Sequence, residues 1–466
     1  MKYSNRTSLC SATAVLLCLV VTAGCALKSP PDRSELMKQS LGDVAPPARW
    51  RGGAIVPGPL AGDWLKTLNE PRLDSLIGDT LARNADLRIA ATRVEQAEAV
   101  LKIAGASLLP AVDLMARQSQ KLAGGGDTSL TGAFLSASWE LDFWGRVRYG
   151  QRAATGQHDS TQSDYAFARL SLAALVAKSW FVAAESSLQR QLAKEMLVAA
   201  ERLAALTRER LRVGSASELD VARAEANVQS YRISERQLEL AREQALRALE
   251  LLAGRYPAAT LAAAETLPAL PASAPTGIPS ELLERRPDII AAEQRVAAAF
   301  DRNEEAKAAR LPRINLLAGL AWIFGSPFIL KDRDNPSASI GAGLVAPLFT
   351  GGALEGQVEV RTAEQKRAVA EYAAIGLKAF HEVESAFANE AALTDRYASL
   401  ERLVVDNERA LKLAEVQYRI GKIDLRGVLD EQLRLYGARV QLLSVQAERL
   451  AQRVNLYLAL GGNVAS

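Results

Sequence analysis

Apolar and polar or small side chains alternate at every second position between Ala133 and Leu141. A period of two is typical of a β-strand that presents one apolar face. Beyond Gly145 the pattern changes to the helical period, and no proline interrupts it before Gly214. Such a helix has roughly 65 residues and, at about 1.5 Å per residue, a length of about 100 Å. That is well beyond the usual helix of a globular protein, so the pattern predicts a strand that leads into a long rod.

The whole pattern occurs twice in the chain. The segment from Asn84 aligns with the segment from Arg286 at a constant offset, and Gly214 aligns with Gly421 at a slightly larger one. Each copy is expected to contain a helix, a strand, a loop, a second strand, a long helix, a turn and a final helix. The difference between the two offsets is placed in the loop between the strands, because loops tolerate insertions.

The repeat divides the chain into segments. A helix is expected from Pro71 to about Ala106 in the first copy. The segment after the signal peptide is interpreted either as an extended stretch along the outside of the rod or as a disordered linker. The predicted segments are a lipoprotein signal peptide (1–24), a lipid-anchored extended N-terminal segment (25–62), the first repeat (63–253, with a β-hairpin at 110–143 and a tip turn at Gly214), an equatorial linker (254–286) and the second repeat (287–466, with a β-hairpin at 312–348 and a tip turn at Gly421).

Four predicted strands, each with one apolar face, favour a membrane β-barrel. Trp139, Trp144 and Trp322 stand toward strand ends, as aromatic residues at membrane interfaces do. Four strands cannot close, and an unpaired edge is not tolerated in lipid. Three chains would supply twelve strands, which is wide enough for an aqueous lumen. The alternative, a half-buried soluble sheet, is disfavoured because no further strands exist to cover the apolar face.

The long helices carry Ala- and Leu-rich seams with charged residues beside them, which predicts antiparallel coiled-coil packing. Gly214 and Gly421 each end a helix, and Ser217 and Asp424 are placed to cap the next helix. The expected fold is mainly α with a membrane β-barrel: a trimeric duct in which a 12-stranded barrel, four strands per chain, continues into a long antiparallel coiled-coil α-barrel.

The N-terminus reads as a targeting signal. Lys2 and Arg6 precede an apolar run that is too short to span a bilayer, and Thr22 leads to Cys25 in a bacterial lipobox pattern. Cys25 would then carry the acyl chains, palmitate among them. The alternative is an ordinary signal peptide cleaved near Ala23. No later segment has 18 consecutive apolar residues, so a membrane crossing is expected through strands.

Composition argues against several function classes. The net charge of +3 comes without a concentrated basic patch, which argues against a nucleic-acid partner. The two histidines, His158 and His381, lie in helical stretches and are not equivalent in the repeat. No metal-ligand spacing, phosphate loop or nucleophile motif appears. We therefore expect no enzyme activity, no cofactor and no metal.

With these residues in view, the chain resembles the TolC-like outer-membrane efflux proteins, and within them the OprM/NodT lipoprotein subfamily of RND-type systems. The resemblance implies a homotrimer in the outer membrane of a Gram-negative bacterium, lipid-anchored and extending into the periplasm. It implies as partners a periplasmic adaptor (membrane fusion) protein and an inner-membrane pump of the RND type. The matching positions are Cys25, Asp63–Trp64, Pro71–Leu73, Asn84–Leu87, Trp139–Arg146, Arg286–Ile289, Pro347–Gly352, Gly214 and Gly421.

The family's tip pattern is only partly present. Tyr418, Gly421 and Asp430 match it, whereas Ile423 and Gly427 replace a basic and an acidic residue. The candidate gate residues are therefore Tyr418, Asp424, Arg426 and Asp430, and the candidate adaptor-contact tips are Gly214, Ser217 and Gly421. Three-fold symmetry would turn an inward-facing aspartate into a ring of carboxylates, which repels anions and concentrates cations. The alternative for each residue is ordinary solvated helix surface, with Asp424 as a helix cap.

The resulting hypothesis is a passive, gated conduit that exports small molecules and depends on a pump for energy. One alternative is a periplasmic coiled-coil adaptor or scaffold lipoprotein without a pore. A nutrient porin is a second alternative, weakened by the long rod. The exported cargo cannot be read from the sequence.

Overall fold

The computed structural model describes residues 27–42, 49–52, 64–119, 130–262, 266–272, 279–324 and 337–462. The predicted signal peptide, Cys25 and most of both inter-strand loops lie outside these residues. Two compact units make up the chain. The first comprises Met1–Ala45, Thr92–Ser163 and Ile290–Ile375, and the second comprises Pro46–Ala91, Asp164–Ile289 and Gly376–Ser466.

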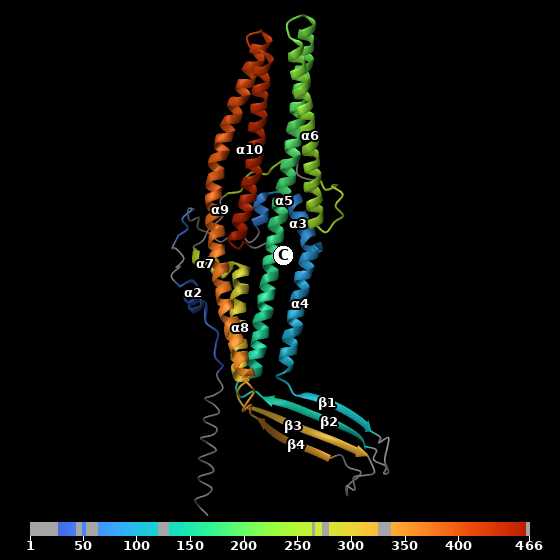
Figure 1. Ribbon diagram of the computed structural model, residues 1–466, viewed down its shortest axis with the longest axis vertical. Coiled ribbons are helices and arrows are strands. Elements are labelled where there is room, and N and C mark those ends of the chain that lie inside the picture. The colour runs from blue at the N-terminus through green and yellow to red at the C-terminus, as the bar shows by residue number, and fades with distance from the viewer. Residues whose placement is uncertain are drawn as a thin grey trace, which may run out of the picture. The chain divides into compact units, whose positions relative to one another are not determined.

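The order of elements repeats along the chain (Figure 1). The long helices α5 and α9 have 67 residues each, and α6 and α10 have 35 each. In chain order the elements are α2 (Arg33–Leu41), the 3-10 helix η1 (Trp64–Leu68), α3 (Pro71–Arg83), α4 (Ala85–Ala106), β1 (Ala111–Ser119), β2 (Leu130–Leu141), α5 (Arg146–Arg212), α6 (Glu218–Leu252), α7 (Pro279–Arg285), α8 (Pro287–Ala308), β3 (Arg313–Phe324), β4 (Ser337–Val345), α9 (Ala353–Arg419) and α10 (Leu425–Ala459).

The expectation of one continuous helix from Pro71 to about Ala106 is wrong at Asn84. This buried residue has an extended backbone with ψ 130°. Its Oδ1 accepts a hydrogen bond from the Leu87 amide at 3.0 Å, and its Nδ2 donates to the Leu252 carbonyl at 2.9 Å. An asparagine side chain competes for backbone hydrogen bonds in this way and ends helices.

In the first unit, the four strands form one antiparallel sheet in the order β1-β2-β3-β4 (Figure 1). Val112 lies opposite Ala137 in the first hairpin, and Ile314 lies opposite Leu344 in the second. These two pairs stand at equivalent positions of the two repeats, so both hairpins have the same register. Strands β2 and β3 join the repeats, and in the described chain the outer edges of β1 and β4 have no partner strand.

The start of α5 packs against α8 in the same unit. A Cβ added at Gly156 would lie 3.2 Å from the Ala298 Cβ, so the small residue allows the helices to approach closely. Nearby, a guanidinium nitrogen of Arg152 is 3.2 Å from Oδ1 of the buried Asp301.

The described start of the N-terminal segment follows these helices. The backbone amide of Lys28 donates to the Tyr149 hydroxyl at 2.8 Å, and its Nζ lies 3.2 Å from Glu304. At the first residue of α2, Arg33 donates two hydrogen bonds to Glu293 of α8. The chain from Lys28 to Arg33 is thus held against α5 and α8.

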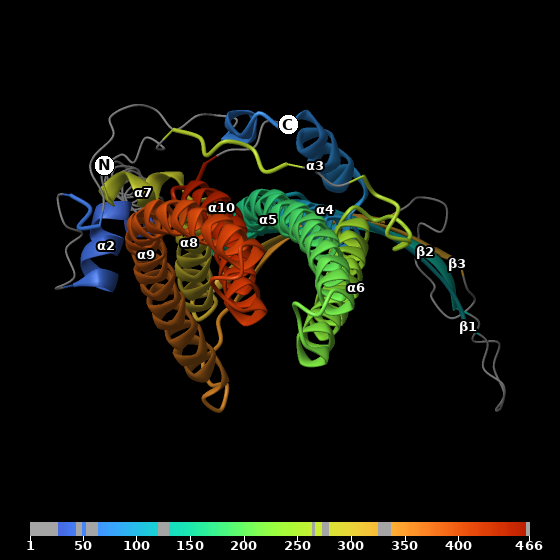
Figure 2. The same ribbon diagram turned by 90° about the horizontal axis from the view of Figure 1, so that it is seen from above.

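The core of the second unit lies between the two long hairpins. Lys178 of α5 donates to Asn455 of α10 at 3.0 Å, and Gln189 of α5 donates to Ser444 at 3.0 Å. Figure 2 accordingly shows α10 beside α5. The large fully buried side chains of this unit include Trp64, Leu73, Ile77, Trp180, Phe181, Leu246, Leu249 and Leu283.

Among the described helices, α5 includes a stretch that is apolar enough to cross a membrane by length and composition, and 44% of that stretch is buried inside the fold. Trp180 and Phe181 lie within the apolar part and contact the core. Core packing therefore accounts for the buried part of this stretch.

Glu250, in the last turn of α6, binds the backbone of the predicted linker that follows the helix. It is buried and accepts backbone N–H hydrogen bonds from Ala259, Thr260 and Leu261 at 2.6–2.9 Å. Burial alone would raise the pKa of Glu250, but these hydrogen bonds stabilise the charged form and leave the pKa below its usual value.

Candidate functional site

The strand register gathers most of the apolar side chains of the four strands on one face of the sheet. Paired residues share a face, and the apolar set of each strand lies opposite the apolar set of its neighbour. A shallow groove of about 410 Å³ runs across this face. The face comprises Val112, Leu114 and Ala116 of β1, Ala133, Leu135, Ala137, Trp139 and Leu141 of β2, Ile314, Leu316, Ala318, Leu320 and Trp322 of β3, and Ala338, Ile340, Ala342 and Leu344 of β4.

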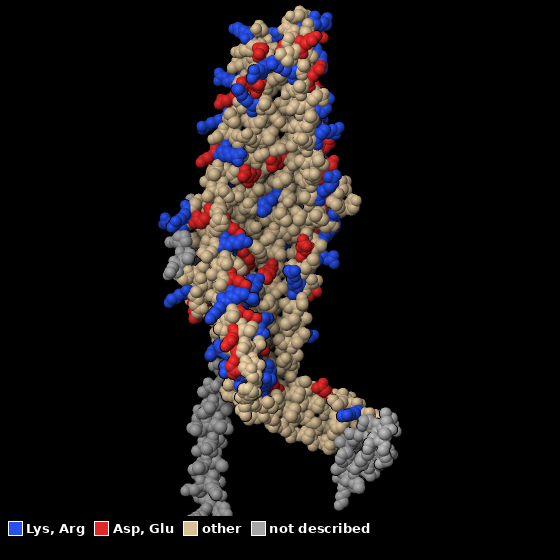
Figure 3. Space-filling model, viewed as in Figure 1, with Lys and Arg blue, Asp and Glu red and all other residues tan. Residues whose placement is uncertain are grey.

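The opposite face is mostly polar or small. One row across the sheet consists of Asp113, Ser136, Gly319 and Ser339, and a second contains Glu140, Asn315 and Gly343. The larger apolar exceptions include Met115, Phe134, Leu317, Ile323 and Val345. In Figure 3 the visible surface of the sheet is almost free of charge, whereas charged side chains of both signs cover the helices. The sheet therefore has the two-sided character of a membrane wall, with lipid on one side and water on the other.

The change from β2 to α5 is held by local polar contacts. Asp142 accepts hydrogen bonds from the backbone amides of Val147 and Arg148 at 3.0 and 2.9 Å, which satisfies the free N–H groups at the helix start. Arg146 forms a bidentate pair with Glu140 at 3.0 and 2.6 Å. These contacts fix the angle at which the strand becomes a helix.

Two tryptophans lie at this end of the sheet, as the sequence pattern predicts. The indole of Trp139 donates to the Leu108 carbonyl at 3.0 Å, and that of Trp144 donates to the Pro312 carbonyl at 2.8 Å. Both rings remain partly exposed. A ring with an apolar body and one satisfied N–H suits the boundary between lipid and water.

The second group of candidate residues lies at the turns between the long helices. Gly214 and Gly421 adopt φ values of 76° and 79°, which an L side chain disfavours. Ser217 and Asp220 form a capping box at the start of α6, and Asp424 accepts the Gly427 amide at 3.2 Å. Both capping assignments made from the sequence are thus confirmed.

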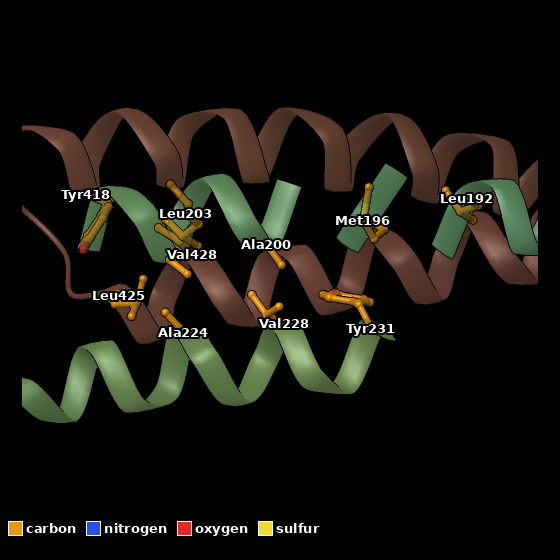
Figure 4. Packing of buried hydrophobic residues seen from close by; sticks show 12 residues of the cluster. Leu192, Met196, Ala200, Leu203, Ala224, Val228, Tyr231, Tyr418, Leu425 and Val428 are labelled. Atoms are coloured by element: carbon orange, nitrogen blue, oxygen red, sulfur yellow. The ribbon is translucent and has the colours of Figure 1, made fainter. Parts of the chain in front are cut away.

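Tyr418 is part of the core at this end of the second unit (Figure 4). Only 5% of the residue is exposed, and its ring packs with a cluster contributed by α5, α6, α9 and α10. Its hydroxyl lies 3.4 Å from the Thr207 hydroxyl. The labelled cluster includes Leu192, Met196, Ala200, Leu203, Ala224, Val228, Tyr231, Leu425 and Val428.

The basic partner of Tyr418 comes from the first repeat. The guanidinium carbon of Arg210 lies 4.3 Å from the centre of the Tyr418 ring, and Nη1 donates to the Tyr418 carbonyl at 2.7 Å. Sequence reasoning missed Arg210 because it searched for a basic residue near Gly421. The available signal was an arginine close to the equivalent turn at Gly214.

The other gate candidates remain on the surface and apart from Tyr418. The side chain of Asp424 is engaged as a helix cap. Arg426 and Asp430 are one helical turn apart, with the closest N–O distance at 3.8 Å and both side chains largely exposed. Within one chain, the four residues predicted for the gate therefore do not form a single cluster.

Comparison with known proteins assigns these features to a family. Residues 76–255 and 278–462 match the family described as outer membrane efflux protein. The pyoverdine export outer membrane protein OpmQ of Pseudomonas putida KT2440 is 35% identical over 442 residues, covering 90% of this chain and 92% of that protein. The cation efflux system protein CusC of Escherichia coli O6:H1 is 30% identical over 409 residues, covering 86% and 88%.

Solved structures support the same family assignment. The outer-membrane channel OprN superposes with a TM-score of 0.83 at 25% identity, covering 94% of this chain and 99% of that chain. This likeness confirms the predicted fold class of four antiparallel strands joined to a long helical tunnel. The chain belongs to the outer membrane efflux protein family and is the outer-membrane channel component of a tripartite efflux system, located in the outer membrane of a Gram-negative bacterium and extending into the periplasm.

Proposed function

We propose that three copies of the chain form a passive, gated duct whose wall in the membrane is a 12-stranded barrel. The main support is the four-stranded sheet, which has one apolar face and two unpartnered edges in the described chain. Edges of this kind are not tolerated in lipid unless another strand pairs with them. Four strands from each of three copies supply a ring wide enough for a water-filled lumen.

The helical hairpins form the periplasmic part of this duct. Their turns, with Gly214, Ser217 and Gly421, provide the surface that the adaptor protein contacts, and an RND-type inner-membrane pump supplies the energy. The protein itself catalyses no reaction. Cys25, which lies outside the described residues, carries the lipid anchor; the contacts of Lys28 and Arg33 with α5 and α8 support an anchored start that follows the rod.

The gate is proposed at the turn end of the hairpins. Exposed Asp430 and Arg426 are available for contacts with neighbouring copies, and the Arg210–Tyr418 contact braces the two turns of one chain. A carboxylate ring at this constriction would concentrate cations. Opening requires the turn of Gly421 to move away from its neighbours.

The proposed cargo is a small molecule delivered by the pump. The relatives with similar walls are named for export of pyoverdine and of cations. Because cargoes of such different chemistry go with one architecture, we assign selection of the cargo to the pump and adaptor.

Reconstitution in planar bilayers tests the proposal. The mature protein should give discrete ion-conducting steps and, in unheated detergent samples, a trimer band that heating converts to monomer. A water-soluble protein that conducts no ions would contradict the duct and support the scaffold alternative.

A further inference from the structure

Two carboxylates of α9 are held by buried arginines from other parts of the second unit. Arg286 lies immediately before α8, is 3% exposed in its side chain and donates to Glu382 at 2.7 Å. Arg453 of α10 is equally buried and donates to Glu390 and to two backbone carbonyls of the predicted linker. The two arginines thus tie one short stretch of α9 to the rest of this unit.

A third carboxylate, between these two, binds the N-terminal segment. Glu384 accepts hydrogen bonds from the backbone amides of Arg51 and Gly52, each at 2.9 Å. Hydrogen bonds to an ionised acceptor are stronger than those between neutral groups, and here each carboxylate oxygen takes one amide. Residues 50–52, which we call the clip, are therefore fixed to α9 through their backbone.

Aromatic rings also hold the clip. Trp50 is 5% exposed, and its ring centre lies 6.4 Å from that of Phe380 and 6.1 Å from that of Phe387. Phe380, Glu384 and Phe387 are four and three residues apart, so they share one face of α9. Gly52 fits closely against this face, because a Cβ added there would lie 3.0 Å from the Phe387 Cβ. The clip therefore covers this face of the helix.

The first repeat lacks these carboxylates. The α5 positions equivalent to the three glutamates of α9 are occupied by Leu175, Ala177 and Ala183. Ala177 and Ala183 are fully buried, so core packing holds α5 at this level. The same stretch of α9 is instead held by charge pairs and by the clip.

We propose that the clip restrains the gate: by holding α9 at Glu384, it limits the movement of the turn at Gly421. This inference rests on the proposed gated duct and gives the N-terminal segment a role in it. Helix α9 continues from Glu384 to Arg419, which corresponds to about 50 Å of helix. Because the turn lies so far along the helix, a small tilt of α9 at the clip displaces the turn by much more.

The clip is the part of this arrangement that is suited to a test. Removing Arg286 or Arg453 would leave carboxylates without their buried partners, and the whole fold would suffer. Glu384 is only partly buried, so water replaces the amides when the clip is released.

Substitutions at the clip are compared in planar bilayers. Trp50→Ala and Glu384→Ala should each increase the single-channel conductance and retain the unheated trimer band. The matched control is Arg51→Ala, which removes an exposed side chain and keeps the backbone amide that Glu384 binds. It should conduct like the unmodified protein. Conductance that is unchanged in both Trp50→Ala and Glu384→Ala would overturn the restraint.

A disulfide separates the restraint from a general loosening of the fold. The close approach of Gly52 to Phe387 needs only a small shift to give the Cβ spacing of about 3.5–4.5 Å in a disulfide. In the Trp50→Ala background, Gly52→Cys with Phe387→Cys should return the conductance toward the unmodified value on oxidation, and a reductant should raise it again. Gly52→Cys alone in that background should not respond.

The outcomes distinguish this inference from the duct itself. Conductance that stays high after the disulfide has formed would overturn the restraint and leave the duct standing. Absence of conductance from the unmodified protein would overturn both.

Discussion

The guanidinium of Arg210 lies over the ring of Tyr418, 4.3 Å from its centre, and donates to the Tyr418 carbonyl at 2.7 Å. Arg210 is in the last turn of α5 and Tyr418 is in the last turn of α9. The contact therefore ties together the ends of the two long helices, one from each repeat, immediately before their turns. It is a polar link between the two repeats at the proposed gate.

Removing this link should loosen the turns. Arg210→Ala loses a cation–π contact and a charge-assisted hydrogen bond, together worth about 1–3 kcal/mol. We expect larger single-channel conductance in planar bilayers and a lower unfolding temperature. The control is Arg212→Ala, an exposed arginine two residues on that pairs only with Glu209 of its own helix among the described residues. Equal conductance in both variants would separate Arg210 from gating.

Asp424 supplies both a helix-capping oxygen and a negative charge, and two variants test these properties separately. Asp424→Ala removes both the helix cap and the charge, at a stability cost of about 1 kcal/mol. Asp424→Ser keeps a capping oxygen and removes only the charge. If the carboxylate belongs to the gate, conductance rises in both variants; a rise confined to Asp424→Ala would assign the effect to capping.

The surface pair of Arg426 and Asp430 should affect conductance more than stability. An exposed pair one turn apart contributes a few tenths of a kcal/mol, so neither single alanine variant should unfold the protein. In the trimer, Asp430→Ala removes three carboxylates from the proposed ring and should reduce cation selectivity, measured as a shift in reversal potential across a salt gradient. An unchanged reversal potential would exclude Asp430 from the lumen.

Asp301 makes stability depend on pH. Burial raises its pKa to about 6, more than the attraction of Arg152 lowers it. A carboxyl whose pKa is higher in the folded than in the unfolded state destabilises the fold when ionised, so its cost is full above pH 6 and disappears as the pH falls toward 4. Asp301→Asn should therefore raise the unfolding temperature at pH 8 and have little effect at pH 4, a difference of about 1–3 kcal/mol. A gain that is the same at both pH values would contradict this.

Asn84 and Arg286 occupy equivalent positions of the two repeats, but replacing them with alanine should destabilise the protein by different amounts. Each donates to the end of a long helix, Asn84 to Leu252 and Arg286 to Ala459. Arg286 also pairs with Asp288 and Glu382 at 2.7 Å while almost fully buried, so Arg286→Ala removes the ion-pair partner of Asp288 and leaves Glu382 with Lys378 at 3.8 Å. We expect a loss of about 3–5 kcal/mol for Arg286→Ala and about 1 kcal/mol for Asn84→Ala, measured by denaturant unfolding in detergent.

Local patterns in the sequence determined much of this protein. The alternation from Ala133 to Leu141 predicted a strand and its apolar face, because successive side chains of a strand point to opposite sides. Ser217 and Asp424 were recognised as caps, because a cap bonds to an amide only three residues away. The two repeats were visible because equivalent residues stand at constant offsets along the chain.

Tertiary structure alone decided the contacts between residues far apart in sequence. The pairing of Arg210 with Tyr418 joins residues 208 positions apart, and no local period carries information about such a contact. Packing likewise placed Tyr418 in the core and left Asp430 at the surface, although both belong to the same sequence pattern. Side-chain period is a property of one element, whereas burial depends on which elements lie against it, and only the folded chain brings those elements together.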